Sequence, residues 1–233
     1  MKLTKDYFED FQNNFNLEPV KTALISVDLQ YGSASRTAGL GKLLQQEKKS
    51  ELGSYRFDRI ERFVVPNVRQ LLAFFREHQL RVIHLTLGSL MQDYSDIPPH
   101  RRAFARAKNI RIGEREHEIL DEVRPVAGEL VINKTTPSAF NSSSIDSVLR
   151  AMGIEYCLFA GVSTHMCVEG TARDAADRGY RSILVEDACG ANKPEFHENA
   201  LLVFQRGYGR VSTTNEVIRE LKQGLVSGRS TPS

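Results

Sequence analysis

The sequence predicts a three-layer α/β/α fold of the Rossmann-like, doubly wound class. Short runs rich in β-branched residues are apolar at consecutive positions, as in strands of a parallel sheet buried on both faces. Between them lie segments whose apolar residues recur every three or four positions, as in helices with one buried side. This alternation implies right-handed crossovers, which place helices on both faces of the sheet.

The expected strands are the apolar runs themselves. They cover residues 23–28, 81–87, 129–133, 155–160 and 181–187, with a shorter sixth candidate at 209–212.

The expected helices lie between and after these strands. They cover residues 66–79, 143–152, 164–178, 193–205 and 213–225. Pro66 suits a first helical turn, where its missing N–H costs nothing. Gly153 and Gly179 stand where a glycine commonly ends a helix.

Two polar segments interrupt this alternation. We interpret residues 32–55 as a long loop or lid and residues 91–106 as an irregular insertion. We expect one globular domain over residues 19–225, an N-terminal arm over 1–18 and a disordered tail over 226–233.

Composition excludes several classes of protein. The 31 Lys and Arg residues nearly balance 29 Asp and Glu, so the net charge of +2 gives no field for nucleic acid or an anionic membrane. No apolar run approaches the roughly 20 residues that span a bilayer. The three cysteines form no close pair, which argues against a disulfide framework or a zinc ribbon. We therefore expect a cytoplasmic protein with reduced thiols.

Polar residues stand at the ends of three expected strands: Asp28, Lys134 and Cys167. Ligands of open parallel sheets bind at the carboxyl ends of the strands. Taken singly, these residues also fit a turn or helix cap, a solvated lysine and a small buried side chain. The fold would bring all three to one edge.

Together, these residue types form a chemically complete set for covalent acyl transfer. A helix N-terminus and a nearby ammonium favour the thiolate of Cys167, so we expect its pKa to be depressed. A carboxylate can take the thiol proton and return it to a leaving amine.

Four motifs then resemble the isochorismatase-like cysteine hydrolases, over roughly residues 18–222. Asp28-Leu-Gln30 is similar to their D-x-Q motif, and Lys134 is followed by Ser138-Ala-Phe140. Residues 161–175 match the pattern G-x-x-T-x-x-C-V-x-x-T-x-R-D-A, and residues 186–188 read Glu-Asp-Ala.

The resemblance implies a six-stranded parallel sheet and a catalytic triad. Asp28 would be the base, Lys134 would assist the thiolate and the transition state, and Cys167 would be the nucleophile. The family also has a non-proline cis peptide, here Val162–Ser163, which would turn the Ser163 amide toward the Cys167 amide to form an oxyanion hole.

The same resemblance narrows the chemistry. Isochorismatases that hydrolyse a vinyl ether usually lack the cysteine, so we expect cleavage of a C–N bond in a small amide or ureide. Vinyl-ether hydrolysis and a non-catalytic relative that binds a metabolite or protein remain alternatives. An Asp-x-His metal element is missing after the second expected strand, so we expect no metal and no cofactor.

Substrate-binding residues are harder to assign. We expect Gln30, Tyr31, Phe140 and Glu169 to contact substrate, although ordinary packing or a subunit salt bridge would also explain them. A basic cluster, Arg101, Arg102 and Arg106, either binds a substrate carboxylate or forms a solvated face.

The remaining polar residues of interest are expected to be structural. His165 as a second base is disfavoured, Arg173 and Asp174 would pair within the helix layer, and Cys157 and Cys189 would be inert. Relatives commonly form oligomers, so we expect a homodimer or homotetramer.

Overall fold

A single six-stranded parallel sheet organises the fold, as expected from the sequence. The computed structural model describes residues 14–228. Its strands follow the spatial order β3-β2-β1-β4-β5-β6. Their bounds are β1 (Thr22–Val27), β2 (Arg81–Leu87), β3 (Leu130–Lys134), β4 (Tyr156–Val162), β5 (Arg181–Gly190) and β6 (Arg210–Ser212).

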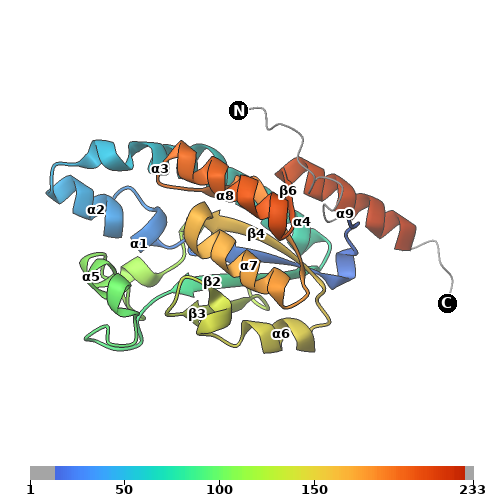
Figure 1. Ribbon diagram of the computed structural model, residues 1–233, viewed down its shortest axis with the longest axis horizontal. Coiled ribbons are helices and arrows are strands. Elements are labelled where there is room, and N and C mark those ends of the chain that lie inside the picture. The colour runs from blue at the N-terminus through green and yellow to red at the C-terminus, as the bar shows by residue number, and fades with distance from the viewer. Residues whose placement is uncertain (1–13, 229–233) are drawn as a thin grey trace.

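Helices cover both faces of this sheet and complete the three layers (Figure 1). The helices that pack on the two faces are α4 (Val65–Glu77), α6 (Ile145–Ala151), α7 (Glu169–Asp177), α8 (Pro194–Gly207) and α9 (Thr214–Gly228). One core joins α4 and α9 to strand residues such as Leu24 and Leu158. A second core joins α6, α7 and α8 to the alternate strand residues, among them Ile25 and Phe159. The continuous apolar runs of the sequence are thus explained by burial on both sides.

The order of the strands creates a switch point between β1 and β4. The chain moves outward from β1 through β2 to β3, then returns to β4 on the other side of β1. Val27 of β1 lies opposite both Leu85 of β2 and Gly161 of β4. The connections that leave the carboxyl ends of β1 and β4 lead to opposite sides of the sheet order, and open α/β sheets bind ligands at such a point.

The polar segment 32–55 is helical, and its interpretation as a long loop was wrong. It contains α2 (Gly39–Gln46) and most of α1 (Tyr31–Ala34), and it leads into α3 (Ser54–Arg59). Leu40 and Leu44 lie one helical turn apart and pack against the first core. Their short amphipathic pattern was hidden by the surrounding Gly, Lys and Glu residues.

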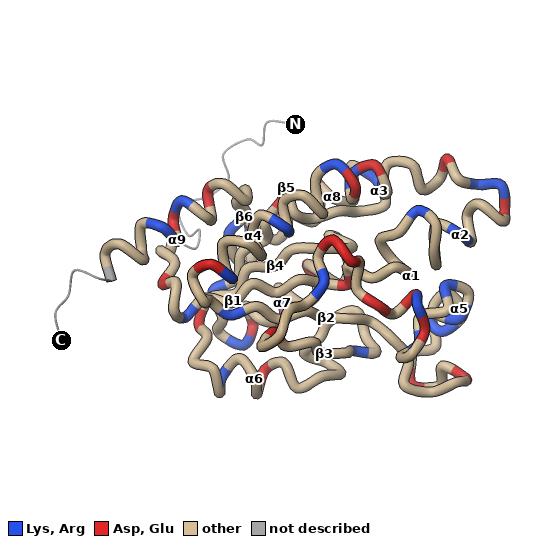
Figure 2. Tube along the Cα trace, turned by 180° about the vertical axis from the view of Figure 1, so that it is seen from behind, with Lys and Arg blue, Asp and Glu red and all other residues tan. Residues whose placement is uncertain are grey.

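The insertion 91–106 is also partly helical, since α5 (Pro99–Ala107) occupies its second half. Its Ala105 packs with Tyr94 and Ile97 in a small cluster of its own. Figures 1 and 2 place α5 beside α1 and α2 at the carboxyl end of the sheet, with basic residues along it.

The termini of the domain differ from the expected boundaries. Residues 1–13 of the predicted arm and 229–233 of the predicted tail lie outside the described residues. Leu17, inside the predicted arm, is buried, and its N–H donates to Glu220 Oε1 at 2.8 Å. Residues 226–228 belong to α9 rather than to a tail.

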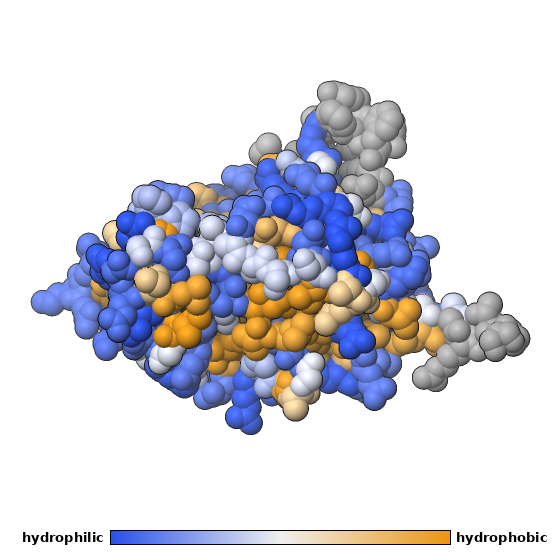
Figure 3. Space-filling model, turned by 90° about the horizontal axis from the view of Figure 1, so that it is seen from below, coloured by the Kyte–Doolittle hydropathy of each residue, from blue (hydrophilic) through white to orange (hydrophobic). Residues whose placement is uncertain are grey.

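Two observations concern the expectations about partners, which exclude a membrane and include further copies of the chain. Within residues 14–228, no helix is long and apolar enough to cross a membrane. Figure 3 shows apolar side chains gathered on the face that lies below in Figure 1, the side of β3 and α6. Leu130 and Val131 of the edge strand β3 are exposed apolar residues. The homodimer or homotetramer stays a prediction.

Candidate active site

Asp28 follows directly after β1, at the switch point of the sheet. Its φ of 51° turns the chain away from the strand, and its backbone N–H donates to Leu85 O at 2.9 Å. Asp residues tolerate this left-handed conformation better than most. The carboxylate is 2% exposed, so its oxygens depend on protein groups rather than on bulk water.

Lys134 ends β3 and forms a buried ion pair with Asp28. Its side chain is 0% exposed, and its Nζ donates to Asp28 Oδ2 at 2.8 Å. The other carboxylate oxygen, Asp28 Oδ1, is buried without a hydrogen-bond partner. One oxygen of Asp28 is therefore held in place while the other is available to accept a proton.

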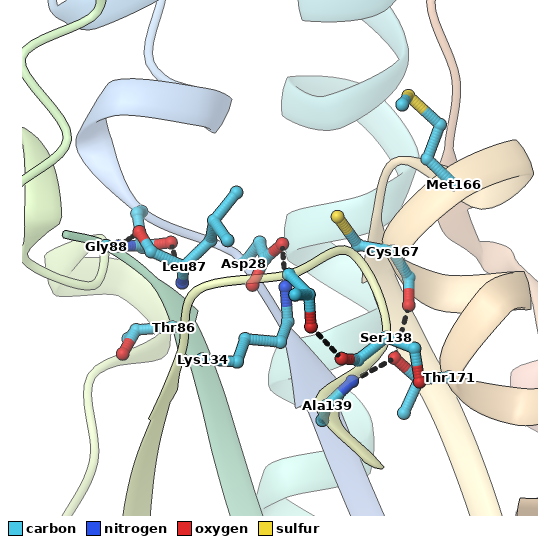
Figure 4. A network of polar contacts seen from close by, with 12 residues as sticks. Asp28, Thr86, Leu87, Gly88, Lys134, Ser138, Ala139, Met166, Cys167 and Thr171 are labelled. Carbon is cyan, nitrogen blue, oxygen red and sulfur yellow. Dashed lines mark hydrogen bonds and ion pairs between the residues drawn. The ribbon is translucent and has the colours of Figure 1, made fainter. Parts of the chain in front are cut away.

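Cys167 lies in η8 (Thr164–Val168), a short helical segment between β4 and α7. It is 5% exposed and shares a pocket with Asp28. Figure 4 shows the side chains of Asp28, Lys134 and Cys167 converging from three separate segments. The structure thus brings together the three residues expected at the strand ends.

The loop after Lys134 is tied to the helix that carries Cys167. Thr171 Oγ1 donates to Cys167 O at 2.6 Å and accepts the N–H of Ala139 at 3.3 Å (Figure 4). Thr171 and Ala139 belong to the same two motifs that hold the cysteine and the lysine in the sequence. Their hydrogen bonds fix the relative positions of β3 and η8.

Gly161 lets β4 approach β1 closely just before the nucleophile. Its φ is +124°, and a Cβ at this position would overlap the carbonyl oxygen of Val27. Two residues later, the expected cis peptide Val162–Ser163 is present. Ser163 also lines the pocket, next to Cys167.

The electrostatics of Cys167 differ from the expectation. Burial raises the pKa of its thiol to about 11, and the neighbouring Lys134 offsets this only in part. Burial alone would lower the pKa of Lys134, but the charges of Asp28 and Cys167 raise it. The expectation of a depressed thiol pKa was therefore wrong, because the effect of desolvation on this pKa outweighs that of the nearby ammonium. The thiol rests protonated and needs a base.

The pocket around Cys167 holds about 430 Å³ of empty space, including its open mouth. Arg101, Phe104 and Lys108 line it from α5 and the residue after it, whereas Ser33, Arg56 and Asn192 line it from other segments.

Arg56 and Lys108 are functional candidates that sequence reasoning missed. Both are charged yet nearly buried, at 5% and 6% exposure. They lie just beyond the polar segment 32–55 and just beyond the insertion 91–106, where charged residues are usually solvated. Only the tertiary packing of α3 and α5 reveals them, and no local signal separated them from surface residues.

Gln30 and Tyr31 lie outside the pocket, contrary to expectation. Gln30 is fully buried and joins two strand ends: its Nε2 donates to Leu87 O at 3.1 Å and its Oε1 accepts the Leu87 N–H at 2.8 Å. The Tyr31 hydroxyl donates to Asp121 Oδ2 at 2.9 Å, under the guanidinium of Arg115. Both residues brace the loops around the site.

Phe140 and Glu169 also have other partners. The Phe140 ring lies 6.0 Å from the ring of Tyr180 and packs against the second core. Glu169 pairs with Arg173 one helical turn later, which explains this carboxylate as an intrahelical ion pair rather than as a substrate or subunit contact. Arg173 therefore pairs within the helix layer, as expected.

The basic cluster divides in two. Arg101 lines the pocket. Arg102 donates to Tyr94 O at 3.0 Å and Arg106 donates to Asp93 O at 2.5 Å. These two arginines hold the loop before α5, so only the first member of the cluster reaches the site.

The remaining side chains of interest lie away from the pocket. The His165 ring packs 4.9 Å from the ring of Phe196. Burial raises the pKa of both Cys157 and Cys189, that of Cys189 to about 12, as for inert thiols. Asp174 pairs with Arg178 at 3.4 Å, not with its neighbour Arg173.

Fold and site together define a Rossmann-like α/β protein with an aspartate, a lysine and a cysteine at the switch point of its sheet. The isochorismatase domain family matches residues 22–216. The chain therefore belongs to the isochorismatase family.

Several relatives with assigned names are similar to this chain. A ureidoacrylate amidohydrolase from Rhizobium rhizogenes is 35% identical over 223 residues, which cover 89% of this chain and 86% of the relative. One from Caulobacter segnis is 39% identical over 110 residues, 47% of this chain. There the chain spans about half of the relative's length, 46%. The solved structure of N-carbamoylsarcosine amidase from Thermoplasma acidophilum is 28% identical, with a TM-score of 0.63, over 84% of this chain and 97% of that one.

Proposed function

We propose that this chain is a cysteine-dependent amidohydrolase. It hydrolyses a C–N bond in a small polar amide or ureide through a thioester on Cys167, releasing ammonia or an amine. The observation that carries the proposal is the environment of Asp28: one oxygen is paired with Lys134, the other is buried without a hydrogen-bond partner, and the residue lines the same pocket as Cys167. The names of the relatives support the same substrate class.

The first half of the reaction acylates the cysteine. Asp28 Oδ1 takes the thiol proton, and the thiolate of Cys167 attacks the carbonyl carbon, forming a C–S bond. The backbone N–H groups of Ser163 and Cys167 stabilise the oxyanion. The C–N bond then breaks, and Asp28 returns its proton to the leaving nitrogen.

The second half releases the acyl group. Asp28 takes a proton from water, and the resulting hydroxide attacks the thioester carbon. The C–S bond breaks, the carboxylic acid product leaves, and the thiolate recovers its proton from Asp28. Lys134 keeps its proton throughout, orients Asp28 and stabilises the thiolate electrostatically, which matters because burial disfavours that thiolate.

Vinyl-ether hydrolysis and non-catalytic binding are the competing functions. A vinyl-ether hydrolase would need Asp28 but not a thiol, and a binding protein would need neither for turnover. The proposed reaction is therefore distinguished by its dependence on both residues.

An ammonia-release screen over small amides and ureides tests the proposal. We expect turnover of at least one of them by the wild type, with complete inactivation by iodoacetamide and loss of turnover in Cys167→Ala and Asp28→Asn. Cys157→Ala serves as the matched control, because this buried thiol lies outside the pocket and should leave turnover intact. Turnover that survives in Cys167→Ala would refute the proposal.

A further inference from the structure

The pocket beside Cys167 is lined by three cationic side chains: Arg56, Arg101 and Lys108. We call these three the cationic wall. Arg56 comes from α3, Arg101 from α5, and Lys108 directly follows α5. They converge on one cavity because α2 and α5 pack together beyond the carboxyl ends of the strands (Figures 1 and 2).

Arg56 is held by neutral groups. Four of its five N–H groups donate: two to Ser33 O, one to Ser163 Oγ at 2.7 Å and one to Asn192 Oδ1 at 2.8 Å. These bonds orient the guanidinium without neutralising it. Burial lowers the pKa of Arg56 only to about 10, so its charge persists at neutral pH.

Lys108 is buried without a carboxylate partner. Its Nζ lies 4.5 Å from the centroid of the Phe104 ring, and no hydrogen bond to this amine is found among the described residues. Arg101 has one weak contact, from Nη1 to Met166 Sδ at 3.6 Å, and a second with the Phe104 ring. A lysine is rarely buried unless it is paired, so the missing partner of Lys108 points to a ligand.

The charge balance of the cavity supports the same conclusion. Asp28 is the single acidic residue among the described pocket-lining residues, and it is already paired with Lys134. No carboxylate among the described lining residues is therefore left to neutralise the cationic wall. Buried charges of one sign are costly unless a counter-ion neutralises them.

We infer that the substrate carries a carboxylate, and that Lys108 is the specificity-determining residue that binds this group. Arg101 and Arg56 add to the positive electrostatic potential in the pocket. The inference rests on the proposed function for the identity of the site, although carboxylate binding itself needs no turnover. A carboxylate satisfies a lysine and an arginine with charge-assisted hydrogen bonds, which a neutral amide group does less well.

The protonation of Lys108 links binding to pH. Burial, together with the charges of Arg56 and Arg101, lowers its pKa to about 7, although Cys167 and Asp28 oppose this shift. Below that pH the amine is charged and ready for an anion. Above it, a bound carboxylate must draw a proton onto Lys108, so carboxylate affinity should fall as the pH rises. Arginine at this position would stay charged and remove the dependence.

Protection of Cys167 from iodoacetamide measures this binding without turnover. Butyrate and 1-butanol form a matched pair that differs in the charged group, and peptide mass spectrometry follows alkylation of Cys167. At pH 6.5 we expect butyrate to protect and 1-butanol to have little effect. Lys108→Met should weaken protection by roughly tenfold or more, the usual worth of a hydrogen bond to a charged group. Because each rate is compared with that of the unliganded protein at the same pH, the titration of the thiol cancels.

The pH series and two further variants complete the test. From pH 7 to 8.5 the butyrate concentration for half protection should rise in the wild type and stay constant in Lys108→Arg. The arginine variant also keeps the test valid if Lys108→Met does not fold. Lys222→Met, on exposed α9, is the control for loss of a surface charge. Equal protection by butyrate and 1-butanol, or an unchanged preference in Lys108→Met, would overturn the inference.

A turnover comparison separates this inference from the proposed function. 3-Ureidopropionate and 3-ureidopropanol are a carboxylate and its neutral counterpart. If the protein releases ammonia from both at equal kcat/KM, the hydrolase proposal stands and the carboxylate inference fails. If neither is hydrolysed but butyrate still protects Cys167 through Lys108, the carboxylate inference stands. The ureido group of these two compounds is then not the bond that the protein cleaves.

Discussion

Lys134 Nζ and Asp28 Oδ2 lie 2.8 Å apart, both buried, at the carboxyl ends of β3 and β1. The pair leaves Asp28 Oδ1 without a hydrogen-bond partner, in a residue that lines the pocket of Cys167. Because burial holds the thiol protonated, the ion pair is as necessary to the proposed reaction as the nucleophile. Each residue is separated from the others in the chain, and only the parallel sheet brings them together.

Breaking this pair should cost both stability and activity. Asp28→Asn leaves the ammonium of Lys134 buried without a counter-ion, which typically costs about 3–5 kcal/mol. Urea unfolding should show that loss, and Asp28→Asn/Lys134→Met should recover part of it because both charges are gone. Neither variant should release ammonia. A double variant no more stable than Asp28→Asn would mean that the pair is not the source of the loss.

The reactivity of Cys167 should follow its raised pKa of about 11. In the unliganded protein, the rate of its alkylation by iodoacetamide should climb about tenfold per pH unit through pH 9, since only the thiolate reacts. A plateau near pH 6 or 7 would instead mean a standing thiolate, as the helix position alone suggested. Tryptic mapping distinguishes Cys167 from the other two cysteines.

Gly161→Ala should destabilise the fold at the switch point. The backbone strain at φ +124° alone costs about 1–3 kcal/mol, and the overlap with Val27 O adds to it. Gly170→Ala is the matched control, because α7 has open space there and alanine is the better helix former by about 0.5–1 kcal/mol. Thermal melts should therefore shift in opposite directions. An unchanged melting temperature in Gly161→Ala would contradict the close approach of β4 and β1.

Glu129 should contribute stability at neutral pH that is lost in acid. Burial alone would raise its pKa, but hydrogen bonds from Arg76, the Val126 amide and His84 lower it to about 2. The contribution is complete above the ordinary value near 4.5 and is lost as the pH falls toward 2. Unfolding free energies measured across this range should fall less steeply for Glu129→Gln. Parallel curves for the two proteins would rule out this role.

The strands could be predicted from the sequence because local patterns encode them. The same holds for the ion pair and for the nucleophile. Continuous apolar runs identify buried parallel strands, and the strand ends then identify Asp28, Lys134 and Cys167. The cationic wall could not be predicted in the same way. Arg56 and Lys108 resemble solvated residues of polar segments, and their burial depends on how α3 and α5 come together around the pocket.

The pocket residues expected from neighbouring motif positions illustrate the same limit. Gln30 and Glu169 lie within two residues of Asp28 and Cys167, yet their side chains serve the scaffold. Proximity in sequence does not determine which face of a turn or helix a side chain occupies.

Mass spectrometry of an acid-quenched reaction is the most direct test of the central claim, covalent catalysis by Cys167. During turnover of an amide that the wild type hydrolyses, the peptide containing Cys167 should gain the mass of the acyl group. Cys167→Ala should show neither adduct nor ammonia release. An unmodified Cys167 at every quench time, together with turnover by Cys167→Ala, would contradict the mechanism.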